Sequence, residues 1–194
     1  MRYSHQKLDV TTYIQLMRDN YVGMDVITQL FLLYTCRANP ILADFISDVY
    51  YLLIQNEKAI ISTEDPRRFV QSALSDGRIQ TTWSKSTIDR VGSHIIASLI
   101  DFDLIDKSKQ ILPYRAHDLT VNYLLHELHF QGYSNMNILN HEDWKIYNLD
   151  PSSLAVIAEK LSFTGTFIFQ YSGEILNIDW KYNNMEEFIE NECR

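Results

Sequence analysis

The strongest constraint on the fold of this 194-residue chain is one long helical pattern that follows Ser84. Ser84 is a residue type that commonly caps the start of a helix. After it, apolar residues recur at helical spacing without a gap, at Ile88, Val91, Ile95, Ile96, Leu99 and Ile100. The pattern predicts a helix with one apolar face, which must pack against other elements to be stable.

Similar patterns predict helices on both sides of this segment. Asn39 and Pro40 supply a cap and a first-turn proline for an apolar helix. Its apolar residues cover more than one face, so we expect this helix at the centre of a helical bundle. Ser62 or Thr63 can cap the helix that follows. The helices predicted in this way start at Val26, Pro40, Glu64, His117, Pro151 and Met185.

Two segments instead have the pattern of β-hairpins. Alternating residues from Phe163 to Tyr171, a turn at Ser172-Gly173 and a second run to Trp180 predict a C-terminal hairpin. Short apolar pairs also flank a polar turn between Leu104 and Leu112. The predicted fold is therefore mainly α: a helical bundle containing a winged-helix-like segment, with a C-terminal β-hairpin and a short terminal helix.

The order of elements from residue 62 to residue 113 leads to the winged-helix interpretation. A helix, a short link, a second helix with a polar start and a hairpin follow one another, as in winged helix-turn-helix modules. We predict a helical region over 1–132 that includes this segment. An acidic α+β region over 133–194 is predicted to pack on it.

Charge is distributed unevenly along the chain. The net charge is −8, from 17 Lys and Arg against 25 Asp and Glu, which argues against a binder that is basic throughout. Residues 1–120 hold 13 basic and 14 acidic side chains, whereas residues 121–194 hold 4 and 11. An anion-binding surface is therefore expected in the first 120 residues. Arg67 to Arg115 holds eight basic residues against five aspartates.

Cysteine usage and hydropathy predict a cytoplasmic protein. Cys36 and Cys193 have no metal-ligand spacing and form no disulfide framework, which fits a reducing compartment. The apolar stretches are shorter than the roughly 18 residues that a membrane span needs. Residues 1–7 lead into no apolar export segment. We therefore expect no membrane partner.

No motif in the sequence predicts an enzyme, a cofactor or a metal. The six glycines are dispersed and form no phosphate-binding loop, and no serine lies in a nucleophile-elbow context. His126 and His129 are three residues apart, whereas the zinc-binding H-E-x-x-H pattern places its histidines four apart. A solvated helix face is the favoured interpretation for them, and a metal-dependent enzyme is a third alternative.

The remaining hypothesis is contact with double-stranded DNA. In a winged helix the second helix enters the major groove, and the hairpin tip meets the backbone. The outward positions of that helix would be Lys85, Ser86, Asp89, Arg90, Ser93 and His94. Lys107 and Lys109 would lie at the hairpin tip, with Arg67, Arg68, Arg78 and Arg115 as flanking support.

The expected DNA binding is modest, and it has an alternative. Asp89 beside Arg90 and Asp106 beside Lys107 partly cancel the positive field. We therefore expect salt-sensitive and weakly sequence-selective binding. Winged folds also serve as protein–protein interaction modules, and the residues alone leave the two functions evenly balanced.

Two stretches of the chain resemble the BrxA family, the small accessory component of BREX phage-defence systems. They are Asn39–Ile46 and the segment from Trp83-Ser84-Lys85-Ser86-Thr87-Ile88 through Leu99 to Ile105. The similarity covers about residues 25–135, and its W-S-x-S-T core is short. The resemblance implies a non-enzymatic, mostly helical protein, likened to the antitermination factor NusB, that binds duplex DNA.

The resemblance also implies partners. Members of the family work beside the methyltransferase and ATPase components of the system, and no catalytic residue carries over to this chain. The alternative within the same complex is a protein–protein interaction scaffold without direct DNA contact. The acidity of this chain and its hairpin after Asp150 depart from the pattern, which bears on where DNA would be contacted.

Overall fold

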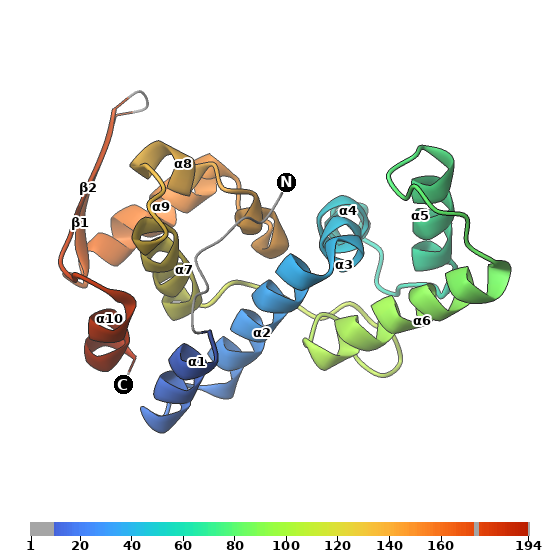
Figure 1. The fold of residues 1–194 in the computed structure, drawn as a ribbon, viewed down its shortest axis with the longest axis horizontal. Coiled ribbons are helices and arrows are strands. Elements are labelled where there is room, and N and C mark those ends of the chain that lie inside the picture. The colour runs from blue at the N-terminus through green and yellow to red at the C-terminus, as the bar shows by residue number, and fades with distance from the viewer. Residues whose placement is uncertain (1–9, 173–174, 194) are drawn as a thin grey trace. The chain divides into compact units, whose positions relative to one another are not determined.

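The computed structural model describes residues 10–172 and 175–193, which form two compact units (Figure 1). The first unit contains the described residues up to Phe31 and those from Ala116 onward, and the second is Leu32–Arg115. The chain is mainly helical and has a C-terminal hairpin followed by a short helix, which confirms the predicted fold class. The predicted boundary at residue 132 stays a prediction. The predicted start segment 1–7 and the turn residue Gly173 lie outside the described residues.

The second unit begins within a long helix and continues through a partly buried helical segment. Helix α2 (Met24–Ala38) leads into α3 (Pro40–Phe45), η1 (Ile46–Tyr50) and α4 (Tyr51–Gln55). The side chain of Asn39 accepts a hydrogen bond from the backbone nitrogen of Leu42 at 3.3 Å, so the predicted cap is present. The segment η1 is a π-helical turn, a local widening that the apolar spacing did not predict. The Tyr50 hydroxyl donates to the Leu104 carbonyl oxygen at 3.0 Å.

Helices α5 (Glu64–Ser75) and α6 (Lys85–Asp101) form the main helix pair of the second unit. Their facing apolar residues are buried, among them Phe69, Val70, Ile95, Ile96 and Leu99. Gly92 of α6 is also buried, and a Cβ atom at this position would lie 3.1 Å from Cγ of Arg67. The glycine therefore permits a close approach of α5 to α6.

The chain reverses after α6 where the sequence predicts a hairpin. Ile105 and Ile111 form an isolated antiparallel bridge, and Ile60 forms a second one with Gln110. The Asp106 nitrogen donates to the Gln110 carbonyl oxygen at 2.9 Å, which closes a three-residue loop. Lys109 adopts a left-handed backbone with φ of 67° in this loop. The segments that the sequence predicts as strands form only single β-bridges here. The winged-helix interpretation stays a prediction.

The first unit is built around one buried helix. It contains α1 (Val10–Asp19), α7 (Asp118–Phe130), α8 (Asn135–Leu139), η2 (Glu142–Tyr147), α9 (Pro151–Ser162), β1 (Phe167–Tyr171), β2 (Leu176–Trp180) and α10 (Met185–Glu192). Strands β1 and β2 pair antiparallel with Phe169 opposite Ile178. Strand β1 begins at Phe167, later than the alternating pattern predicts. The reason is that α9 extends to Ser162 and is followed by a turn through Gly165, whose φ is 80°.

Helix α7 carries a histidine at the centre of an aromatic cluster. The His126 ring stacks on Phe188 at 4.1 Å and meets Trp180 edge-on at 4.9 Å between ring centroids. Its Nδ1 lies 2.9 Å from the carbonyl oxygen of Asn122. The residue is fully buried, and burial lowers the pKa of its imidazole to about 4. The expected solvated helix face is therefore wrong for His126, because the hairpin and α10 cover it.

This burial predicts a loss of stability in acid. Because His126 is neutral in the folded state, the unfolded chain takes up a proton that the folded chain does not as the pH falls from 6.5 to 4. The free energy of unfolding should therefore fall by about 3 kcal/mol across this range. We expect His126→Phe to reduce this loss, measured by urea unfolding at pH 7 and pH 4.5. An equal loss in both proteins would contradict the assignment.

Candidate nucleic-acid interface

The start of α6 combines hydroxyl groups with an exposed lysine. The Ser84 hydroxyl accepts a hydrogen bond from the Thr87 backbone nitrogen at 3.2 Å, as predicted for a cap. It also lies 2.9 Å from the hydroxyl oxygens of Ser86 and Thr87. Lys85 is the first residue of the helix and is exposed. Helix starts carry a positive partial charge and unpaired N–H groups, so this arrangement is suited to a phosphate.

Arg90 lies further along α6 and keeps its charge. The neighbouring Asp89 forms an ion pair with Arg67 of α5, at 3.1 Å from Nε to Oδ1, and Arg67 also bonds Glu64. Arg90 is exposed and forms no ion pair with any residue that the structure describes. The tertiary structure thus directs Asp89 to Arg67, whereas sequence adjacency suggested that Asp89 cancels Arg90.

Three of the predicted flanking arginines have acidic partners. Besides Arg67, Arg68 pairs with the buried Asp65, and Arg78 pairs with Asp76 at 2.8 Å. The guanidinium of Arg78 also lies over the Phe69 ring at 5.2 Å. Hydrogen bonds from Arg78 lower the pKa of Asp76. These arginines stabilise the second unit, and the partner carboxylates compensate much of their charge.

The lysines of the turn after α6 lie beside one ionised carboxylate. Asp106 accepts hydrogen bonds from the Ser108 hydroxyl at 2.7 Å and the Gln110 nitrogen at 2.9 Å. These bonds lower the pKa of the Asp106 carboxyl, so it stays negative. Lys107 is exposed and Lys109 is half-buried at the tip of the turn. The field at the tip is therefore weaker than two lysines alone would produce.

The nine predicted site residues do not form one continuous surface group. Lys85, Ser86 and Arg90 lie on the first half of α6, whereas Lys107 and Lys109 follow its C-terminal end. The 17 residues of α6 extend about 24 Å from end to end. Arg115 is exposed and is the last residue of the second unit.

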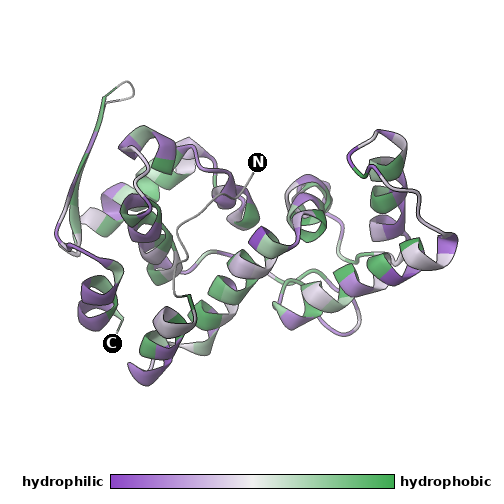
Figure 2. Ribbon diagram, viewed as in Figure 1, coloured by the Kyte–Doolittle hydropathy of each residue, from purple (hydrophilic) through white to green (hydrophobic). Residues whose placement is uncertain are grey.

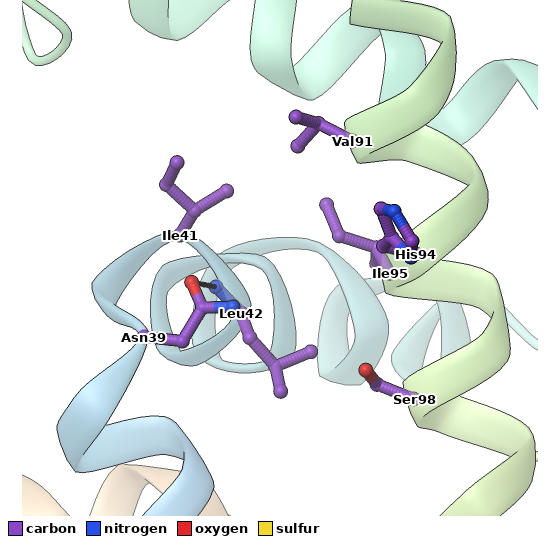
Figure 3. Close-up of a pocket in the computed structure, with 7 residues that line it drawn as sticks. All are labelled: Asn39, Ile41, Leu42, Val91, His94, Ile95 and Ser98. Atoms are coloured by element: carbon purple, nitrogen blue, oxygen red, sulfur yellow. Dashed lines mark hydrogen bonds between the residues drawn. The ribbon is translucent and has the colours of Figure 1, made fainter. Parts of the chain in front are cut away.

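A pocket beside α6 was not predicted from the sequence. His94, predicted to point outward, is exposed and lines a pocket of about 390 Å³ between α3 and α6. Figure 3 shows Ile41 from α3 opposite Val91 from α6, with Ser98 further along the same stripe. The spacing of Val91, His94, Ile95 and Ser98 is the signal that indicates this face. The lining holds aliphatic and neutral polar groups with one histidine and no lysine or arginine, which does not suit a phosphate.

The described part of the chain contains neither a metal-ligand cluster nor a helix that could cross a membrane. It contains no group of three His, Cys, Asp or Glu side chains placed to bind a metal. His129 stacks on Trp180 at 4.4 Å between ring centroids, and burial lowers its pKa. Among the same residues, no helix has the length and hydropathy needed to cross a membrane.

The cap at Ser84 predicts a measurable difference between two neighbouring serines. Ser84→Ala removes the acceptor for Thr87 and should lower the free energy of unfolding by about 1 kcal/mol. Ser86→Ala is the matched control, because its exposed hydroxyl caps nothing, and the change should stay within about 0.5 kcal/mol. Urea unfolding of both variants checks this. Equal losses would show that Ser84 has no special capping role.

Comparison with known proteins identifies the family. No curated protein and no solved structure matches the chain. The protein-family model BrxA matches residues 12–127, which is more than half of the chain and includes the whole second unit. The resemblance seen at Asn39–Ile46 and around Trp83 lies inside this match and is confirmed. This chain belongs to the BrxA family.

Proposed function

We propose that this chain, a BREX-associated accessory protein of phage defence by its family, binds duplex DNA and catalyses no reaction. The single observation that carries the proposal is the pair of exposed cations on the first half of α6. Lys85 and Arg90 form no ion pair with any described carboxylate. The neighbouring hydroxyls of Ser84 and Ser86 add hydrogen-bonding groups that suit a phosphate.

The distribution of charge between the two units supports this assignment. The second unit holds ten Lys and Arg against ten Asp and Glu, whereas the net charge of −8 belongs to the other unit. Electrostatic repulsion of a phosphate is therefore weaker in the second unit than in the first. Lys107 and Lys109 add a second contact point at the turn after α6.

The strength and selectivity of binding follow from the same charges. Four cations without described partners, Lys85, Arg90, Lys107 and Lys109, support only a few phosphate contacts. The affinity should therefore be modest and fall with salt. Phosphate contacts carry no sequence information directly, so weak sequence selectivity is expected.

A second candidate function rests on the paired arginines. Arg67, Arg68 and Arg78 are each bound to carboxylates, which leaves a smaller cationic surface than the sequence predicts. A protein–protein interaction scaffold among BREX components needs no cationic surface. The salt dependence of duplex binding distinguishes the two functions.

The test reverses the two cations on α6. Lys85→Glu/Arg90→Glu should weaken binding of a short duplex by at least about tenfold at low salt. The dependence of log affinity on log salt should lose about two units of slope, because two phosphate contacts disappear. Fluorescence anisotropy with a labelled duplex measures both quantities.

A control variant separates local contact from net charge. Arg18→Glu/Lys145→Glu changes the net charge equally, at two exposed positions of the first unit. It should leave duplex affinity within about twofold of the parent. An unchanged affinity in a folded Lys85/Arg90 variant, or an equal loss in the control, would remove the DNA assignment.

A further inference from the structure

The C-terminal hairpin has two open edges. Among the described residues, β1 and β2 form a two-stranded sheet with no third strand, and Figure 1 shows them at the outer side of α8 and α9. The base of the hairpin packs on the rest of the unit, where Phe167 and Ile178 are buried. Beyond this base, the unpaired backbone groups of an edge strand can pair with another polypeptide.

The register shows which backbone groups point outward. The Ser172 nitrogen donates to Ile175 and the Lys181 nitrogen donates to Thr166, so the even-numbered residues of β1 make the bonds within the hairpin. The N–H and C=O groups of Phe167, Phe169 and Tyr171 then face away from β2. No described backbone group bonds to them.

Strand β1 lacks the features that usually protect an edge. Its sequence, Phe-Ile-Phe-Gln-Tyr, contains no charge and no proline. Ile168 is 59% exposed and Tyr171 is 44% exposed, and Ile175, just before β2, is 72% exposed. Strand β2, by contrast, carries Asp179. The edge of β1 is therefore both open and flanked by exposed apolar side chains.

The net charge of the unit that carries the hairpin favours a basic partner. The first unit holds fifteen acidic and seven basic residues. Arg18, Lys160 and Lys181 are already paired with Asp19, Asp118 and Glu192. Helix α10 follows the hairpin, contributes four glutamates and is largely hydrophilic in Figure 2. A second copy of this unit, or a nucleic acid, would bring like charges together.

We propose that the outer edge of β1 accepts an extended segment of a partner protein, one that alternates apolar residues with Lys or Arg, as a third strand. Main-chain hydrogen bonds to Phe169 and Tyr171 supply the affinity, whereas Phe167 is buried at the base of the hairpin. A basic side chain on the face of Ile168 lies two strands from Asp179, about 10 Å away. The proposal does not depend on DNA binding, since its residues lie outside the second unit.

A synthetic peptide tests the edge directly on the full chain. The probe is a labelled peptide of about nine residues that alternates Lys and Val, close to the length of a long strand. We expect saturable, salt-sensitive binding by fluorescence anisotropy. A peptide with Glu in place of Lys should bind at least about tenfold more weakly. N-methylation of alternate residues on the pairing edge should abolish binding without any change to the protein.

Two proline variants identify the edge. Phe169→Pro removes an outward N–H and leaves the hydrogen bonds to β2 in place. The hairpin should therefore stay folded, and peptide binding should be lost. Leu176→Pro is the matched control, because its N–H points outward from the other edge, and it should keep the peptide. Far-UV circular dichroism and urea unfolding verify that both variants remain folded.

The outcomes that overturn the proposal are specific. They are no binding of the Lys peptide, equal binding of the Glu peptide, or full binding by a folded Phe169→Pro variant. Self-association in sedimentation that Phe169→Pro abolishes would assign the edge to a second copy and would also overturn it. None of these outcomes changes the result of the duplex experiment with Lys85 and Arg90.

Discussion

The ion pairs at the contact between α5 and α6 decide which cations the second unit presents. Gly92 leaves room for α5 to approach, and Arg67 lies there between Glu64 and Asp89. This pairing removes Asp89 as a partner for Arg90, so Arg90 keeps an uncompensated charge. The same ion pairs compensate the charge of Arg67. The helix contact that stabilises the unit therefore also selects its candidate phosphate ligands.

The two units differ in net charge, so each favours a different kind of partner. The second unit is electrically neutral and presents a few unpaired cations, whereas the first carries the whole net charge of −8. Nucleic acids repel an acidic surface and basic polypeptides are attracted to it. A DNA contact in one unit and a basic protein contact in the other are therefore compatible in a single accessory protein.

Each unit contains a helix that is followed by a tight reversal of the chain. Helix α6 precedes the turn at Asp106–Gln110, and α9 precedes the hairpin of β1 and β2. Val156 of α9 is 69% exposed and Phe163, just after this helix, is 85% exposed, while Lys160 of α9 pairs with Asp118. The exposed surfaces beside the two reversals therefore differ in chemical character. The order of elements alone does not determine the ligand.

The helix starts were predictable because capping is local. Asn39, Ser84 and Asp150 each bond a backbone nitrogen within three residues, so their effect is visible in a short stretch of sequence. The apolar period of α6 and the terminal helix Met185–Glu192 follow from equally local patterns. The BrxA resemblance likewise rests on short contiguous stretches.

Tertiary structure decided the rest, since it depends on partners far apart in the chain. Arg67 and Asp89 are 22 positions apart, and Arg78 and Asp48 are 30 apart, so no local pattern indicates which charges cancel. The burial of His126 depends on the hairpin and α10, more than 40 residues later. The sequence by itself determined most of the helices from α2 onward, the C-terminal hairpin and the family, but not α1, α8 or η2. Only the folded chain determined which cations remain unpaired and which edge stays open, because both depend on contacts between distant segments.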